Sequence, residues 1–236
     1  LQTFLKYDLV TAIQLTAGSD PEVYQSSRTP LIYIFHKLFN PFNENKIFFI
    51  RSVFVVSLIL PFIFYLCLKQ KFKQEESLLL ILISTIICLS PYFRTSAYWG
   101  LEENFSLISL LLAFLFLNQF LHNSKNVFKD YYQIFFAVFF SSLCLYFDQK
   151  LTIIPLICFF HIIFCDRGIK IKIFALFLYF IFSLPYIYLI TIWGNIIPTG
   201  DALNRGIGAQ LYLQHIGYMS TIMAFYLLPL LFYKKE

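Results

Sequence analysis

Long apolar segments, separated by short charged ones, constrain this chain more than any other feature. Most of these segments, which lie between Ile47 and Tyr233, are near the roughly 20 residues that a helix needs to cross a bilayer. Lipid cannot hydrogen-bond a free backbone, so such segments cross it as helices. We predict spans at Ile47–Leu68, Leu78–Tyr92, Phe105–Leu121, Ile134–Phe147, Leu151–Cys165, Ile171–Ile192 and Leu211–Phe232. The predicted fold is an all-α, polytopic transmembrane helical bundle of about seven spans.

The composition supports this fold independently of any single segment. Of the 236 residues, 59% are hydrophobic and only 13% are charged, whereas a soluble domain carries about 25% charged residues. The net charge of +5 comes mostly from lysines between the apolar segments. We therefore interpret this charge as a sign of membrane topology, and we expect no nucleic-acid partner.

The basic residues divide unequally between alternate gaps. One set of gaps holds only Arg94, Lys150 and Arg205. The other set holds Lys69, Lys71, Lys73, Lys125, Lys129, Arg167, Lys170, Lys172, Lys234 and Lys235. Because cytosolic loops carry the excess of Lys and Arg, the second set is predicted to be cytosolic. Nearly every residue whose side chain could take part in catalysis or binding then lies on the non-cytosolic face.

The first 46 residues differ from the rest. They alternate short apolar runs with polar stretches, and no run in them is long enough to span a bilayer. We predict that residues 1–46 form loops and short interfacial helices on the non-cytosolic side, and that residues 47–236 form the transmembrane domain. The chain begins at Leu1 rather than Met. We therefore expect it to be a fragment of a longer protein, or a mature portion whose first membrane helix is missing.

Three non-cytosolic loops carry acids and bases, and each loop has a plain structural explanation as well. The first loop, Arg94–Asn104, contains Glu102 and Glu103, which could cap the helix that follows them, because the helix dipole favours carboxylates there. Asp148-Gln-Lys150 could be a polar hairpin tip, although it contains no Gly or Asn to form the turn. The long third loop, from Trp193 to Gln210, could be solvated, but long loops are more often functional. Charged side chains at a membrane interface usually pair with an opposite charge or bind a ligand.

Several stretches resemble motifs of the GT-C membrane glycosyltransferases. Asp20-Pro with Arg28-Thr-Pro-Leu-Ile-Tyr33 resembles "DP…TTPPGLY", and Ser90-Pro-Tyr-Phe with Tyr98-Trp-Gly-Leu-Glu-Glu-Asn-Phe-Ser106 resembles "FP…FFxxLYYTDxxS". Phe147-Asp-Gln-Lys-Leu-Thr-Ile153 resembles "FRQTNI", and Gly200-Asp201 with His215 resembles "GD…H…LHxxQLxYF". The order is most similar to that of the dolichyl-phosphate-glucose-dependent alpha-1,2-glucosyltransferase family. Only Tyr7-Asp8-Leu9 stands where that family has the acidic motif "MDEIFH".

The resemblance implies an enzyme that transfers a hexose, with glucose favoured, from a polyprenyl- or dolichyl-phosphate donor. The acceptor would be a lipid-linked glycan or another hydroxyl compound, and the reaction would invert the anomeric centre. The donor leaves as a lipid phosphate, so we expect no cofactor and no obligatory metal. The implied location is the endoplasmic reticulum membrane or a bacterial inner membrane, with membrane lipid as surroundings and the active loops luminal or periplasmic.

The site residues follow from that chemistry. Asp8, Glu102 and Glu103 are the candidate catalytic bases, with Asp8 first because of its position relative to the family motif. The candidate substrate-binding residues are Asp20, Arg28, Arg94, Tyr98, Trp99, Asp148, Gln149, Lys150, Asp201, Arg205 and His215. Cationic side chains would balance the phosphate, and the aromatic rings would stack on the sugar.

Two other classes of protein stay open. A transporter or lipid flippase would also need a bundle with one-sided loops, but charged residues at mid-span, which mark translocation paths, are missing. A non-catalytic membrane subunit would keep the fold without using the carboxylates. Glycosylation of a bound acceptor, and its dependence on those carboxylates, separates the three classes.

Overall fold

The computed structural model describes residues 31–41, 45–122 and 127–193, all within one compact unit, Leu1–Ala202. The other residues, including a second unit, Leu203–Glu236, and the predicted span Leu211–Phe232, lie outside the described ranges. Every regular element in the described ranges is helical, which confirms the all-α prediction for this part of the chain. The elements are α2 (Leu31–Phe39), α3 (Lys46–Ser57), α4 (Ile59–Lys71), α5 (Ser77–Thr85), η2 (Ile86–Leu89), α6 (Pro91–Trp99), α7 (Glu103–His122), α8 (Val127–Phe147), η3 (Gln149–Leu151), α9 (Ile153–Phe164) and α10 (Ile169–Trp193).

Among the described residues, four helical stretches are long and apolar enough to cross a membrane. They are Ile47–Lys71, formed by α3 and α4, then Glu103–His122 in α7, Phe128–Phe147 in α8 and Ile169–Thr191 in α10. Each corresponds to a predicted span. The prediction of about seven spans is therefore met only in part.

The predicted start of the fourth span, at Ile134, is wrong. Helix α8 begins at Val127, seven residues earlier. Asp130 and Gln133 interrupt the hydrophobic pattern in the sequence, but both side chains are buried, and Arg167 pairs with Asp130. The predicted fifth span, Leu151–Cys165, corresponds to the shorter apolar stretch Gln149–Phe164, which is not among the four spanning candidates.

The predicted second span continues into a bent pair of helices. The stretch Ser77–Leu89 and the helix α6 meet at an angle of 63°, which makes them a broken span or a re-entrant loop. Pro91 occupies the first turn of α6, where its missing N–H and fixed φ suit a helix start. Gly100 ends α6 at φ 71°, and a Cβ there would lie 2.9 Å from the ring of Phe49.

The prediction that Arg94–Asn104 forms a loop is therefore wrong. Arg94 to Trp99 are helical in α6, and Glu103 and Asn104 already belong to α7. Only Gly100, Leu101 and Glu102 connect the two helices. The Ser-Pro start and the glycine end of α6 were both readable in the sequence.

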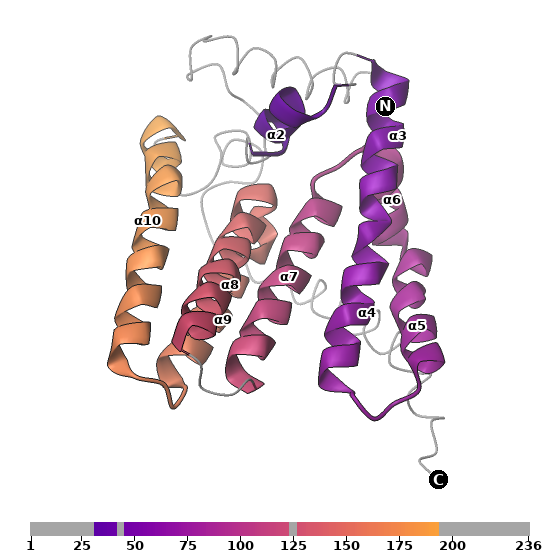
Figure 1. Ribbon diagram of the computed structural model, residues 1–236. Coiled ribbons are helices and arrows are strands. Elements are labelled where there is room, and N and C mark those ends of the chain that lie inside the picture. Colours follow the sequence, from indigo (N-terminus) through magenta and orange to yellow (C-terminus); the bar gives the residue numbers. More distant parts are fainter. Residues whose placement is uncertain (1–30, 42–44, 123–126, 194–236) are drawn as a thin grey trace, which may run out of the picture. The chain divides into compact units, whose positions relative to one another are not determined.

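Helices α4, α7, α8 and α10 run side by side, with α9 packed on α8 (Figure 1). Because consecutive helices alternate in direction, the connections fall at two ends. Lys69, Lys71 and Lys73 share one end with Arg167 and Lys170, whereas Glu102, Glu103 and Asp148 lie at the opposite end. The helix arrangement thus gathers these basic residues at the end of the helices opposite Glu102, Glu103 and Asp148.

The main core lies between α7, α8, α9 and α10. Its fully buried members include Phe120, Ile134, Val138 and Cys158. One polar side chain in this layer binds the backbone of α10: the Tyr146 hydroxyl donates to the Phe182 carbonyl at 2.5 Å and accepts from the Tyr186 N–H at 2.9 Å. These contacts join α8 to α10 next to Pro185.

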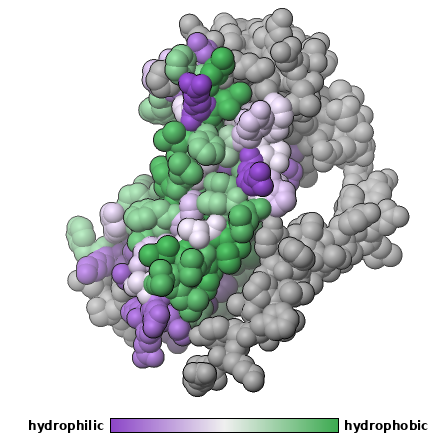
Figure 2. Space-filling view, turned by 90° about the vertical axis from the view of Figure 1, so that its right-hand side faces the viewer, coloured by the Kyte–Doolittle hydropathy of each residue, from purple (hydrophilic) through white to green (hydrophobic). Residues whose placement is uncertain are grey.

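Large apolar side chains are exposed along the described helices. Phe62, Leu78 and Phe180 are among the most exposed of them, as are many of their neighbours. Figure 2 shows hydrophobic residues over much of one face, with a group of hydrophilic residues at its lower end and a few others farther up. Monomeric soluble proteins rarely expose apolar surface on this scale, and a protein surrounded by lipid needs it.

Helix α2 covers the ends of α3, α7 and α8. Its residues Ile32 and Phe35 pack in a second apolar cluster with Phe49, Phe105 and Phe147. Helix α2 is a short helix within residues 1–46, where short interfacial helices were predicted, and its place at a membrane interface stays a prediction. Phe105 follows Glu103 by two residues and Phe147 directly precedes Asp148, so α2 packs beside the carboxylate-bearing end.

His36 is the polar centre of this second cluster. Its ring is 7% exposed and lies 4.6 Å from the Phe49 ring and 5.4 Å from the Phe105 ring, measured between centroids. The Asn40 amide donates to His36 Nδ1 at 3.2 Å, so the ring proton is on Nε2, for which the described residues provide no partner. Burial lowers the pKa of His36 to about 4.

Because His36 is buried in its neutral form, we expect the stability of the protein to fall at acidic pH. The unfolded chain protonates His36 below a pKa of 6.5, whereas the folded ring stays neutral until about pH 4, so stability falls as the pH drops through that window. Between pH 7.5 and 5 we expect the wild type to lose roughly 2 kcal/mol more than the His36→Gln variant. Thermal unfolding of both proteins at the two pH values measures the difference. Equal pH dependence in both proteins would show that His36 does not contribute.

Candidate functional site

The carboxylates at one end of the bundle come from two antiparallel helices. Glu103 opens α7, Glu102 precedes it, and Asp148 directly follows α8. Their exposed fractions are 6% for Glu102, 8% for Glu103 and 5% for Asp148. Carboxylates are rarely buried to this degree unless they are paired, so their partners decide what the site can do.

Lys150 lies between two of these carboxylates. Its ammonium nitrogen is 3.8 Å from Glu103 Oε1 and 3.9 Å from Asp148 Oδ2. These distances are longer than the 2.7–2.9 Å of charge-assisted hydrogen bonds, so the lysine balances charge without forming a tight bond. Its side chain is 61% exposed, which leaves it able to shift between the two acids.

Asp148 shapes the connection between α8 and α9. Its Oδ1 accepts a hydrogen bond of 3.0 Å from the Lys150 backbone N–H and so caps the η3 turn. Its Oδ2 accepts from the Tyr92 hydroxyl at 3.4 Å. Asp148 itself forms the turn, in a segment that contains no Gly or Asn. Because both of its oxygens accept hydrogen bonds, we interpret it as a residue that positions η3 and Tyr92.

Glu103 differs from Asp148 in having an unused oxygen. Its Oε1 faces Lys150, whereas the described residues provide no hydrogen-bond partner for the buried Oε2. A buried carboxylate oxygen without a donor is costly and is able to accept a proton from a substrate hydroxyl. Among the described carboxylates of this cluster, Glu103 is therefore the candidate acid–base group.

A buried hydrogen-bond network around Asn104 anchors the first turn of α7, which carries Glu103. The Asn104 side chain is fully buried, and its amide donates to Ser57 Oγ at 3.0 Å and to the Phe93 carbonyl at 3.1 Å. The Asn104 backbone N–H donates to Ser96 Oγ at 3.2 Å. These bonds tie the first turn of α7 to α3 and α6, and so fix the direction of the neighbouring glutamate.

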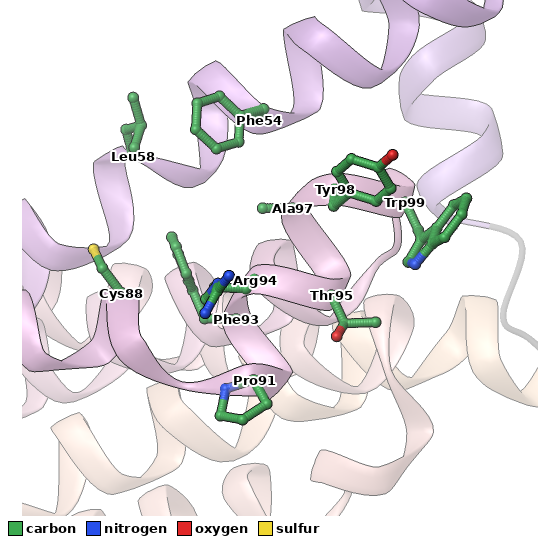
Figure 3. Close-up of a pocket in the computed structure, with 10 residues that line it drawn as sticks. All are labelled: Phe54, Leu58, Cys88, Pro91, Phe93, Arg94, Thr95, Ala97, Tyr98 and Trp99. Atoms are coloured by element: carbon green, nitrogen blue, oxygen red, sulfur yellow. The ribbon is translucent and has the colours of Figure 1, made fainter.

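A pocket of about 590 Å³ lies between α3 and the bent pair that ends in α6. Figure 3 shows the Arg94 side chain midway along it, with Leu58 and Cys88 toward one end and Tyr98 and Trp99 toward the other. The remaining lining residues are Phe54, Pro91, Phe93, Thr95 and Ala97. The pocket is thus an apolar site with one cationic side chain.

The pocket and the carboxylates lie on different faces of α6. Tyr92 reaches Asp148 from this helix, whereas Arg94, two residues later, lines the pocket. Positions two apart on an α-helix point about 200° apart. Trp99, the last residue of α6, is the lining residue of the pocket that is closest in sequence to Glu103.

The structure brings together Glu103, Asp148 and Lys150 from the predicted set, and groups Arg94, Tyr98 and Trp99 separately in the pocket. Glu102 is buried next to the first group, and Gln149 begins η3 within it. The other predicted site residues lie outside the described ranges: Asp8, Asp20, Arg28, Asp201, Arg205 and His215. In the described part of the chain, no three His, Cys, Asp or Glu residues are grouped to hold a metal ion.

Sequence reasoning missed Tyr92 and Asn104. Tyr92 was the last residue of the predicted span Leu78–Tyr92, and Asn104 was assigned to a loop. A polar side chain next to a predicted span boundary was the available signal for both. Recognising α6 as a separate helix would have placed Tyr92 on the face toward α8.

The whole chain was compared with protein-family models, curated proteins and solved structures, and no match was found in any of the three.

Proposed function

We propose that this protein is an integral-membrane glycosyltransferase of the GT-C type, which moves a hexose from a polyprenyl- or dolichyl-phosphate donor to an acceptor hydroxyl. Two independent lines support the proposal. The ordered resemblances to GT-C motifs include Tyr98-Trp-Gly-Leu-Glu-Glu-Asn-Phe-Ser106 and Phe147-Asp-Gln-Lys150. The acids within these two stretches, Glu103 and Asp148, share one lysine in the structure.

The observation that carries the proposal is the state of Glu103. It is a buried carboxylate with one oxygen beside Lys150 and the other without a donor among the described residues. A single displacement at a sugar carbon needs one such base and no covalent intermediate. Asp8, which the resemblance puts first, stays a candidate outside the described residues.

The reaction then balances with no further reagent. The acceptor oxygen forms a bond to the anomeric carbon and gives its proton to Glu103 Oε2. The bond between that carbon and the donor's phosphate oxygen breaks, and the lipid phosphate leaves with the electron pair. Attack opposite the leaving group inverts the configuration. Lys150 stabilises the negative charges of Glu103 and Asp148 before the proton arrives.

The reaction takes place on the non-cytosolic face in this proposal. The support is the distribution of charge: Lys69, Lys71, Arg167 and Lys170 lie at the end opposite Glu103, and an excess of basic residues marks the cytosolic side. The membrane is that of the endoplasmic reticulum or the inner membrane of a bacterium.

One observation favours a lipid flippase as a second candidate. The bent pair that ends in α6 lines an open pocket in an otherwise regular set of helices, and broken helices occur in transporters. A flippase moves a lipid without changing it covalently, so product analysis separates the two functions.

The proposed function is tested by the donor that the full-length protein accepts. Purified protein in liposomes is given a radiolabelled polyprenyl-phosphohexose or, in parallel, the matching nucleotide sugar, with an extract of lipid-linked glycans as acceptor. We expect label in the acceptor only with the lipid donor, because no nucleotide-binding motif is present in the sequence. Transfer from the nucleotide sugar alone would contradict the proposal.

A further inference from the structure

Arg94 lies in an apolar pocket, with no counter-ion among the described residues. Its side chain lines the cavity between α3 and α6, where the other lining residues are apolar or aromatic except Thr95. None of the described carboxylates forms an ion pair with it. An unpaired charge next to lipid is expensive, and a bound anion removes that cost.

Lys150, the other described cation of the candidate site, is placed differently. It already lies within 4 Å of Glu103 and Asp148. Any phosphate that approached Lys150 would also approach these two negative charges. The charge arrangement therefore disfavours a phosphate at Lys150 and favours one at Arg94.

We infer that Arg94 binds the phosphate of the lipid-linked sugar donor, with the polyprenyl chain in the pocket toward Leu58 and Cys88 and the hexose toward Tyr98 and Trp99. This inference rests on the proposed function and adds to it the donor site and its direction. Lys150 is then a positioning residue for the carboxylates and does not bind the donor.

The shape and charge of the pocket fit this amphiphile. A polyprenyl-phosphohexose is a phosphodiester with one negative charge, which one guanidinium balances. Figure 3 shows the order along the pocket as apolar side chains, then Arg94, then two aromatic rings. The donor has the same order of apolar chain, phosphate and sugar.

In sequence, the aromatic end of the pocket is the end nearest to the proposed base. Trp99 and Gly100 end α6, and Glu103 begins α7 after two further residues. Tyr98 and Trp99 lie edge to face with ring centroids 4.8 Å apart, and aromatic faces of this kind accept sugars. A hexose held by these rings is at the end of α6 from which the chain continues to Glu103, while the lipid chain extends toward Leu58 and Cys88.

The test is binding of a photoreactive, radiolabelled polyprenyl-phosphohexose to the full-length protein in phosphatidylcholine vesicles. Arg94→Gln is expected to weaken binding about 10- to 100-fold, because it removes a charge-assisted pair. Lys150→Gln is the matched control and is expected to change binding less than about twofold. Label in the wild type should map to α3 and α6.

A second pair of variants tests the pocket without removing a charge. Leu58→Trp fills the apolar end from a position that is 48% exposed, so the core is not disturbed. Ile59→Trp, at a residue that is 47% exposed and does not line the pocket, is its control. We expect the first to weaken binding at least about fivefold and the second to leave it unchanged.

Three results would overturn the inference: binding that depends on Lys150 instead of Arg94, equal competition by phosphatidylglycerol, or insensitivity to both Arg94→Gln and Leu58→Trp. Failure of the proposed function has a different signature. Arg94-dependent binding without any hexose transfer would leave the donor site in place and refute the transferase. Normal hexose transfer, with donor binding that does not depend on Arg94, would support the transferase and refute the donor site at Arg94.

Discussion

Replacing Glu103 with Gln is expected to lower hexose transfer by at least about 100-fold while donor binding is unchanged. The substitution keeps the size of the side chain and an oxygen for Lys150, but it removes the group that takes the acceptor's proton. General-base catalysis typically contributes between about 10² and 10⁴ in rate. The measurement is initial transfer rate and donor affinity of the two purified proteins in the same vesicles.

The matched control for this prediction is Glu76→Gln. Glu76 is exposed in the connection between α4 and α5, at the end of the bundle opposite Glu103. It is expected to transfer at the wild-type rate. Equal rates for Glu103→Gln and wild type would remove Glu103 as the base and move the role to Asp8 or Glu102.

Replacing Arg167 with Gln is expected to destabilise the protein by about 3 to 5 kcal/mol. Arg167 Nη1 lies 3.3 Å from Asp130 Oδ2, and both side chains are buried. Its Nη2 also donates to the Phe120 carbonyl at 2.7 Å, near the end of α7. Without the guanidinium, a carboxylate is left buried without its charge partner. Thermal unfolding in detergent measures the loss.

Two further variants show whether the ion pair itself is responsible. The double substitution Asp130→Leu with Arg167→Met is expected to cost less than Arg167→Gln alone, because no unpaired charge remains. Lys170→Gln, at an exposed residue of the same end, should change stability by less than about 0.5 kcal/mol. A larger loss in the double variant than in the single one would show that packing, and not charge, is decisive.

The helical fold was predictable because hydrophobicity alone defines long spans. Glu103–His122 and Ile169–Thr191 differ from the predicted boundaries by only a few residues. The prediction failed where a buried polar residue has a partner that is distant in the sequence. The predicted span began only at Ile134 because Asp130 and Gln133 interrupt the apolar pattern. The pairing of Asp130 with Arg167, 37 residues away, cannot be seen in a local pattern.

The candidate site was predictable in its members but not in its grouping. Glu103, Asp148 and Lys150 were selected because charge is costly at a membrane interface, and they lie together. Arg94 was placed in the same loop as Glu102 and Glu103, yet the helix α6 directs it into a separate pocket. Such a distinction depends on which face of a helix a residue occupies, and an assumed loop has no faces.

The most direct test of the transferase is to follow hexose transfer and lipid movement together in sealed liposomes that contain the full-length protein. A radiolabelled polyprenyl-phosphohexose is the substrate, and the anomeric configuration of any product is determined by NMR. The predicted result is a glycosylated acceptor with inverted configuration, formed by the wild type and not by Glu103→Gln. Movement of unchanged donor across the bilayer, with no glycosylated product, would contradict it and identify a flippase.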